Sequence, residues 1–207
     1  PRAGLTIPEA ARAEADALIG GVPGMTPGRL LVGLHVGAGR AVKEWPASRL
    51  ADVGAWAALE RGAAIILTGS SDDRAAADEV RRALPGDAAI ADTVGRAGLL
   101  ALAAILSRLS LFVTPDTGPM HLAAAVGAPV VALFGPSSAE RWGPLSPKAR
   151  IVRVDLPCSP CNRIRNPPAR CQGHTPDCMD GIRTRAVIEA AAGLLPAPPR
   201  EAPHGAR

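Results

Sequence analysis

The residues best suited to chemistry lie in "VTPDTGPMHLAAAVGAPVVALFGPSS", residues 113 to 138. Asp116, Thr117 and Gly118 form a polar turn between a β-branched strand and an alanine-rich helix, and His121 follows one helical turn later. A helix that begins at such a turn directs free N–H groups and the positive end of its dipole outward, which suits a phosphate group. Alternatively, Asp116 only caps the helix. The stretch therefore predicts either a phosphate site or an ordinary cap.

A second polar turn, "HVGAGRAVKEWP" at residues 35–46, also follows an apolar run. Gly37 and Gly39 resemble the start of a dinucleotide-binding loop, but Val42 stands where the third Gly is expected. Lys43 is one of only two lysines in a chain with 23 basic residues. A lysine in a Gly-rich loop provides a compact positive charge for phosphate, although an exposed loop lysine is the plain alternative.

Two further Gly-bearing turns follow apolar runs. "LTGSSDD" at residues 67–73 places Ser71 and Asp72 after Gly69, where they can meet a ribose hydroxyl or cap a helix. "TVGRAG" at residues 93–98 contains Gly95. Because ligands of open parallel sheets bind at the carboxyl ends of strands, we expect these polar turns to converge on one edge.

Short apolar runs alternate with longer helical patterns along the chain, which predicts an α/β fold with a doubly wound parallel sheet. Strands are predicted at residues 30–36, 63–69, 88–92, 110–114, 129–135 and 149–155. Helices are predicted at residues 8–19, 46–62, 72–84, 97–109, 117–126 and 183–195. Residues 1–29 are expected to be a lead-in or linker, 30–195 the folded domain, and the Pro-rich residues 196–207 a disordered tail.

The composition narrows the function classes. The 207 residues are 47% hydrophobic but only 2% aromatic, so stacking platforms for nucleic acid are scarce. The net charge of +4 comes from interspersed Arg and acidic residues, which favours at most a phosphate-bearing small molecule. No uninterrupted apolar run reaches a membrane-spanning length, and the first 17 residues do not form a signal peptide.

Together these motifs resemble the C-terminal half of family 9 glycosyltransferases, the ADP-heptose:lipopolysaccharide heptosyltransferases and their relatives. The resemblance covers roughly residues 30–192. It rests on "GAGRAVKEWP", "IILTGSSDD", the run from "DTVGRAG" to "ALFGPSS", and the terminal "CSPC…C…CMDGI". The resemblance implies the Rossmann-like donor-binding domain of a GT-B enzyme, with inverting and metal-independent transfer of a sugar from an ADP-sugar.

The resemblance also implies roles for individual residues. Lys43 and Asp116 would act in catalysis, with Lys43 at the diphosphate or sugar and Asp116 at the sugar hydroxyls. Thr117, Gly118 and His121 would surround the phosphates. Gly37, Gly39, Gly69 and Gly95 would shape the donor site, and Ser71 and Asp72 fall near the ribose, with the register uncertain by one or two positions.

The family's acceptor, a lipopolysaccharide or other cell-envelope glycan, is bound by an N-terminal domain that also holds the catalytic base. No carboxylate in a Gly-rich context precedes the first predicted strand, so the chain is expected to be a donor-binding half that does not turn over alone. The resemblance further implies a cytoplasmic location, with at most peripheral contact at the inner face of the cytoplasmic membrane.

The four cysteines gather within residues 157–179, at Cys158, Cys161, Cys171 and Cys178. Four thiols in one loop match a structural zinc site in number, although the six-residue spacing of the second pair is unusual. Reduced thiols or a local disulfide, and an iron–sulfur site, are the alternatives. No cofactor is expected to be required for catalysis.

Other functions remain open from the sequence. The chain could belong to another GT-B enzyme, such as a sugar-nucleotide epimerase, or be a non-catalytic module that binds a nucleotide-sugar. A nicotinamide dehydrogenase is disfavoured because the third Gly is absent and no acidic residue ends the second predicted strand.

Overall fold

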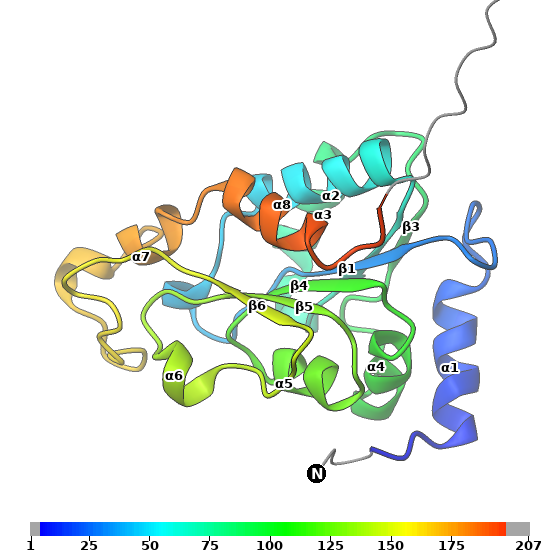
Figure 1. The fold of residues 1–207 in the computed structure, drawn as a ribbon, viewed down its shortest axis with the longest axis horizontal. Helices are drawn as coiled ribbons and strands as arrows, with labels where there is room; N and C mark the ends of the chain where they lie inside the picture. Colours follow the sequence, from blue (N-terminus) through cyan, green and yellow to red (C-terminus); the bar gives the residue numbers. More distant parts are fainter. Residues whose placement is uncertain (1–4, 198–207) are drawn as a thin grey trace, which may run out of the picture.

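A computed structural model describes residues 5–197 of the chain. Its centre is a six-stranded parallel sheet with the strand order β3-β2-β1-β4-β5-β6 (Figure 1). The strands are β1 (Leu31–His35), β2 (Ala64–Thr68), β3 (Ile90–Asp92), β4 (Leu111–Pro115), β5 (Val130–Leu133) and β6 (Ala149–Val152). The predicted fold class, a doubly wound parallel α/β sheet, is confirmed.

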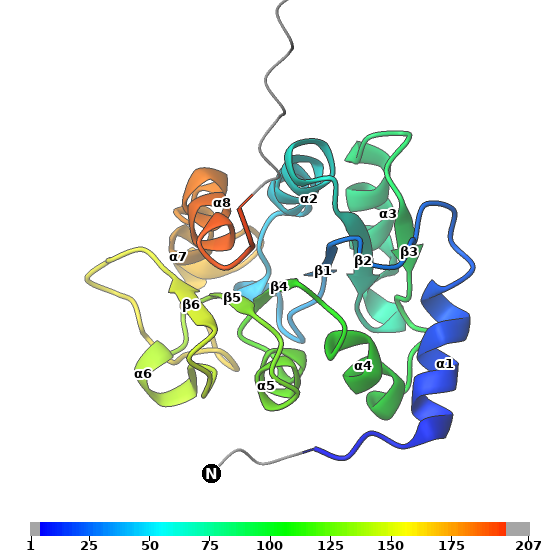
Figure 2. The same ribbon diagram turned by 45° about the vertical axis from the view of Figure 1, so that its right-hand side comes forward.

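Helices cover both faces of the sheet (Figure 2). One face packs against α2 (Ala47–Arg61), α3 (Arg74–Ala83) and α8 (Thr184–Ala192). The other packs against α1 (Glu9–Ile19), α4 (Leu99–Leu106) and α5 (Gly118–Ala125). Shorter elements are η1 (Ala41–Lys43), η2 (Ser71–Asp73), α6 (Ala139–Trp142), η3 (Ala169–Cys171) and α7 (Asp177–Asp180).

Alternation along the strands creates two apolar cores. In β2, Ile65 and Leu67 join the core under α2 and α3, while Ile66 joins the core under α4. Burial of both faces explains why each strand is a nearly continuous apolar run.

The direction of winding reverses between β1 and β4, which are adjacent in the sheet but separated by two strands in sequence. Leu34 of β1 pairs with Val113 of β4, so the two strands end at nearly the same level. The chain leaves β1 towards α2 on one face and leaves β4 towards α5 on the other. Such a reversal opens a crevice at the carboxyl ends of the strands, where ligands of doubly wound sheets bind.

The lead-in segment forms α1 as expected, but this helix also packs against α4. Ala11, Ala15 and Ile19 of α1 are buried in the same core as Ile66. Most of the predicted tail, residues 198–207, lies outside the described residues. Most other differences from the predicted elements are short shifts at the ends. Within residues 5–197, no helix combines the length and apolar character needed to cross a membrane.

Candidate functional site

Lys43 and Asp116 meet at the reversal point although 73 residues separate them. Lys43 ends η1 in the turn after β1, and Asp116 directly follows β4. The Lys43 ammonium donates to the Asp116 carboxylate, with Nζ and Oδ2 3.2 Å apart, and also to the Asp116 backbone carbonyl. Both side chains are largely enclosed, at 15% and 12% exposure. The fold therefore pairs the two residues for which the family resemblance implies catalytic roles.

Asp116 does not cap the following helix. α5 begins at Gly118, and Thr117 occupies the N-cap position with extended backbone and no capping side-chain bond. The Thr117 hydroxyl is instead hydrogen-bonded to that of Thr114, 3.1 Å away. The first N–H groups of α5 are thus left without a side-chain acceptor, beside the Lys43 ammonium. This combination of helix terminus and cation suits a phosphate group.

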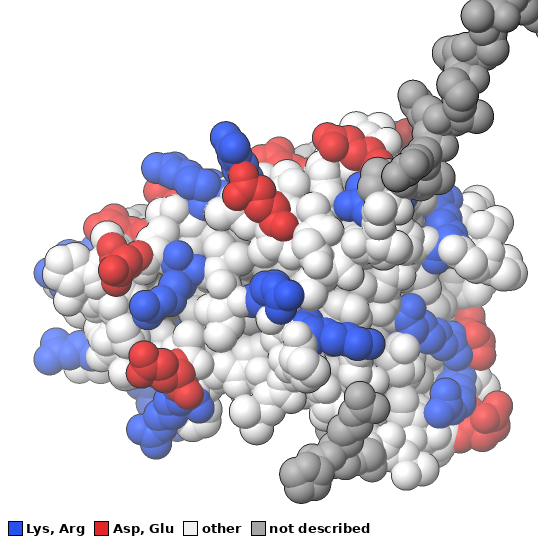
Figure 3. All heavy atoms as spheres, viewed as in Figure 1, with Lys and Arg blue, Asp and Glu red and all other residues white. Residues whose placement is uncertain are grey.

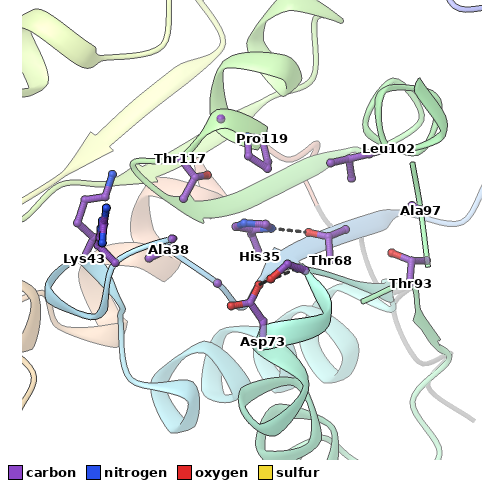
Figure 4. A pocket seen from close by; sticks show the side chains of 16 residues that line it. His35, Ala38, Lys43, Thr68, Asp73, Thr93, Ala97, Leu102, Thr117 and Pro119 are labelled. Atoms are coloured by element: carbon purple, nitrogen blue, oxygen red, sulfur yellow. Dashed lines mark hydrogen bonds between the residues drawn. The ribbon is translucent and has the colours of Figure 1, made fainter. Parts of the chain in front are cut away.

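A cavity of about 480 Å³ opens at this point between the ends of β1, β2 and β4 (Figure 4). Its lining includes six of the predicted site residues, namely Gly37, Gly39, Lys43, Gly69, Thr117 and Gly118. Asp116 and His121 line an adjoining, larger cavity that shares Arg40, Lys43, Thr117 and Gly118 with the first. The polar turns after β1, β2 and β4 therefore meet at one edge, as the sequence predicts.

Ser71 and Asp72 lie away from this cavity, and their neighbours Ser70 and Asp73 line it instead. The reason is a capping box at η2, in which the Asp73 carboxylate accepts from both the backbone N–H and the hydroxyl of Ser70, each at 2.7 Å. That turn leaves Ser71 and Asp72 exposed to solvent. The cavity therefore contains a hydroxyl and a carboxylate, as expected for a ribose site. They belong to Ser70 and Asp73, each one position away from the predicted Ser71 and Asp72.

Gly95 supports the turn rather than lining either of these two cavities. Its N–H donates to the Gly69 carbonyl at 2.9 Å, and a β-carbon at this position would come within 3.0 Å of the Ser71 α-carbon. A φ of +70° and this close approach both favour glycine.

His35 is a cavity residue that the sequence reasoning missed. It ends β1 with 7% exposure, and its Nδ1 is hydrogen-bonded to the Thr68 hydroxyl at 3.0 Å (Figure 4). Burial lowers its pKa to about 4, against the opposing effects of the nearby Asp73 carboxylate and the Thr68 contact. The ring is therefore neutral at pH 7. An imidazole at the end of an apolar strand, two residues before Gly37, was the available signal.

The four cysteine side chains line one small cavity of about 30 Å³. All four are free thiols, with Cys158 exposed and Cys178 buried. Burial, followed by the neighbouring Cys161, raises the pKa of Cys178 to about 11. Within residues 5–197, no group of three or more His, Cys, Asp or Glu side chains is arranged as a metal site. The sequence prediction of a shared thiol cluster agrees with this geometry, whereas a metal centre remains a prediction.

Comparison with known proteins identifies the family. Residues 2–170 match glycosyltransferase family 9, the heptosyltransferase family. The chain belongs to this family. It is 36% identical over 155 residues to lipopolysaccharide heptosyltransferase 2 of Escherichia coli K12, covering 74% of this chain and 43% of that protein.

Solved structures of family 9 proteins share the fold. The E. coli ADP-heptose lipopolysaccharide heptosyltransferase II superposes with a TM-score of 0.74 at 26% identity. A family 9 glycosyl transferase from Veillonella parvula superposes with a TM-score of 0.79 at 27% identity. Each comparison covers 92% of this chain and 53% of the solved chain. The chain thus spans about half the length of these family 9 proteins.

Proposed function

We propose that this chain forms the donor site of a family 9 glycosyltransferase. The enzyme transfers a sugar, with heptose as the leading candidate, from an ADP-sugar to a lipopolysaccharide or other cell-envelope glycan. The observation that carries the proposal is the pairing of Lys43 with Asp116 at the reversal point, beside the free N–H groups of α5. Membership of the family and the E. coli protein's description as an ADP-heptose heptosyltransferase support it.

The proposed chemistry is an inverting displacement. An acceptor hydroxyl forms a bond to the anomeric carbon as the bond to the diphosphate oxygen breaks, and the hydroxyl proton passes to a base. The leaving diphosphate gains negative charge, which Lys43 and the N–H groups of α5 stabilise without a metal ion. Asp116 holds the Lys43 ammonium and accepts hydrogen bonds from the sugar hydroxyls, while Ser70 and Asp73 face the ribose. The base and the acceptor site are assigned to the family's N-terminal domain.

Calorimetric titration with ADP, UDP and NAD tests the donor assignment. We expect ADP to bind more tightly than the other two nucleotides, because the proposed donor is an ADP-sugar. Tightest binding to NAD, or no nucleotide binding by a chain shown to be folded, would contradict the proposal.

The two lysines of the chain provide a matched pair of variants. Lys43→Ala should weaken ADP binding by about 1.5–3 kcal/mol, the usual contribution of a hydrogen bond to a charged group. Lys148→Ala removes the same charge at an exposed position that lines neither cavity, and should leave ADP affinity unchanged. Equal losses in both variants would indicate a general charge effect.

We also propose that Cys158, Cys161, Cys171 and Cys178 hold a structural zinc ion. Support comes from the convergence of the four thiols on one cavity, since thiolates in this number suit tetrahedral zinc. Zinc should co-purify at about one equivalent, and the Cys158→Ser/Cys161→Ser double variant should lose it. Absence of zinc together with four freely titrating thiols in the folded protein would remove the site.

We propose that the protein acts in the cytoplasm and contacts the inner face of the cytoplasmic membrane peripherally, where a glycolipid acceptor would lie. Cell fractionation tests this location. Recovery in the membrane fraction only after low-salt lysis, with release by salt, is the expected behaviour of a peripheral charge-mediated contact. Retention after high-salt or alkaline washing would contradict it.

A further inference from the structure

The connection from α6 to β6, together with that strand, exposes apolar side chains to solvent. Leu145 is 97% exposed, more than any other large hydrophobic residue among residues 5–197, and Ile151 of β6 is 44% exposed. The two lie on adjoining parts of the surface, because a β-carbon on Gly143, two residues before Leu145, would lie 3.2 Å from Cδ1 of Ile151. Exposed apolar side chains that gather in one place mark an interaction surface.

The same segment is positively charged. Residues 142–153 contain three basic side chains, Lys148, Arg150 and Arg153, and no acidic one. All three are exposed, and among residues 5–197 none of them forms an ion pair. The Arg150 guanidinium donates to two nearby backbone carbonyls, which do not neutralise its charge. Figure 3 shows Lys and Arg side chains along the course of β6, at the centre of one face of the molecule. We call this surface the β6 flank, formed by Leu145, Lys148, Arg150, Ile151 and Arg153.

The β6 flank is poorly suited to pairing with another β-strand. β6 is an edge strand, so one side of it offers unpaired backbone groups. It is only four residues long, and Pro147, two residues before its start, has no N–H for a longer ladder. An antiparallel pair of β6 strands from two copies would also bring Arg150 and its basic neighbours close to the same charges, which is destabilising. The flank therefore suits an anionic partner and not a second copy of this chain.

An anionic lipid surface matches both features of the flank. Basic side chains are attracted to the phosphate groups of such a surface, and exposed apolar side chains enter the boundary between head groups and acyl chains. Trp142, at the start of the segment, is 46% exposed, and tryptophan is enriched at that boundary in membrane proteins. A soluble anion would use the positive charges but not the apolar side chains. The combination therefore favours a bilayer surface.

We propose that the β6 flank binds the surface of an anionic phospholipid bilayer. This inference rests on the proposed transferase function and its peripheral location, and it names the part of the chain that makes the contact. Trp142 also lines the larger cavity beside the donor pocket, so docking through the flank places that cavity next to the bilayer. A glycolipid acceptor then reaches the donor while its lipid part stays in the membrane.

Vesicle co-sedimentation with the full chain tests the proposal at low ionic strength. One set of vesicles contains phosphatidylcholine alone, and the other contains phosphatidylcholine and phosphatidylglycerol in a ratio of about 2:1. The chain should bind the mixed vesicles at least about tenfold more tightly, and this binding should weaken as salt is added. Similar binding to both kinds of vesicle would overturn the proposal.

Two double variants separate the flank from the overall charge. Lys148→Gln/Arg150→Gln should lower the affinity for mixed vesicles at least about fivefold, with ADP affinity changed less than about twofold. Arg12→Gln/Arg82→Gln removes the same charge at exposed positions of α1 and α3, and should bind the vesicles like the parent chain. Equal losses in the two variants would show a general charge effect and contradict the assignment to the flank.

A pair of leucine variants tests the apolar part of the contact. Leu145→Ser should lower the affinity for mixed vesicles at least about threefold, because a side chain that enters the bilayer becomes polar. Leu59→Ser is the control, since Leu59 is 69% exposed on α2 and lies outside the flank. Both leucines are exposed, so both variants should keep the melting temperature of the parent chain. Equal vesicle affinities of the two variants would exclude insertion of Leu145.

The same proteins distinguish other partners of the flank. Binding of poly-L-glutamate as tight as binding of mixed vesicles, and unaffected by Leu145→Ser, would indicate an acidic polypeptide and overturn the proposal. A dimer of the parent chain in sedimentation velocity that Leu145→Ser dissociates would assign the flank to a second copy. ADP binding without vesicle binding would overturn the role of the flank alone. Vesicle binding by a chain that does not bind ADP would support the flank and contradict the donor assignment.

Discussion

The pairing of Lys43 with Asp116 sets two demands on one carboxylate. Asp116 must neutralise a largely enclosed ammonium group and also remain available to a sugar hydroxyl. A carboxylate has about four acceptor positions, so one oxygen can satisfy Lys43 while the other faces the ligand. The Lys43 ammonium also donates to the Asp116 backbone carbonyl, which no side-chain substitution removes. Loss of the carboxylate should therefore affect the sugar contact more than the position of the lysine.

Replacing Asp116 with Ala should weaken binding of an ADP-sugar more than binding of ADP. The expected difference is about 1.5–3 kcal/mol, because only the nucleotide-sugar presents the hydroxyls that the carboxylate accepts from. Titrations of both ligands on the Asp116→Ala and Asp116→Asn proteins measure it, and Asn should retain part of the sugar contact. Equal losses for ADP and ADP-sugar, with a lowered melting temperature, would assign Asp116 a purely structural role.

His35 should make the stability of the fold depend on pH. Because burial lowers its pKa from 6.5 to about 4, the unfolded chain binds a proton between these values while the folded chain does not. The free energy of unfolding should thus fall as the pH falls through this window, by about 1–3 kcal/mol from this residue. Urea unfolding at pH 7 and pH 4.5 should show this loss in the parent and not in His35→Gln. An NMR titration of the His35 ring with a midpoint near 6.5 would contradict the prediction.

The turn after β2 depends on the turn after β1. A β-carbon on Gly37 would overlap the carboxylate of Asp73, which is fixed by its bonds to Ser70. Gly37→Ala should therefore displace Asp73, cost about 1–3 kcal/mol of stability and weaken ADP binding. Gly86→Ala is the control, because its β-carbon would meet no atom within 4 Å. Denaturant curves and ADP titrations measure both effects, and similar behaviour of the two variants would exclude this coupling.

The Cys-rich loop should contain thiols of very different reactivity in metal-free protein. Cys178 is buried and its raised pKa keeps it protonated at pH 8, whereas Cys158 is exposed. Because the thiolate is the nucleophile, iodoacetamide should modify Cys178 at least about tenfold more slowly than Cys158. Peptide mass spectrometry over time measures the two rates, with urea-unfolded protein as the reference for equal access. Equal rates in the folded protein would contradict the buried position.

The elements that could be predicted from sequence are those set by local patterns. Thr117 and Gly118 could be predicted because they stand in a polar turn at the end of an apolar strand, and Lys43 because it is a rare lysine in a Gly-rich loop after such a strand. The sequence predicts Ser71 and Asp72 as site residues, whereas the structure places Ser70 and Asp73 in the cavity. This difference of one position arises because the capping box of η2 depends on backbone geometry within a single turn. Arg163 and Arg165, which line the larger cavity, were not predicted as site residues. Their proximity to Arg40 arises only when the Cys-rich loop is tied to the turn after β5.

The sheet topology follows from the alternation of strands and helices, but its reversal point does not. The local sequence pattern of residues 30–36 does not indicate that this strand pairs with residues 111–113. The pairing results from packing helices on both faces, and it brings Lys43 to Asp116. The lead-in helix α1 shows the same limit of sequence-based prediction. The sequence pattern of a short amphipathic helix is the same whether the helix is free in solution or packed against a domain. In the structure, Ala15 of α1 is fully buried against the domain.

Ala15→Glu tests whether α1 is integral to the fold or a linker beside it. A buried and unpaired carboxylate should cost about 3 kcal/mol, while Ala10→Glu places the same group at an exposed position of the same helix. If the two cores unfold cooperatively, the loss should also appear in the Trp fluorescence, because Trp45 and Trp56 pack in the core on the opposite face of the sheet. Urea curves recorded by Trp fluorescence and by circular dichroism should then shift together. An unchanged fluorescence midpoint in Ala15→Glu would mean that α1 detaches alone and that residues 1–29 behave as the linker expected from the sequence.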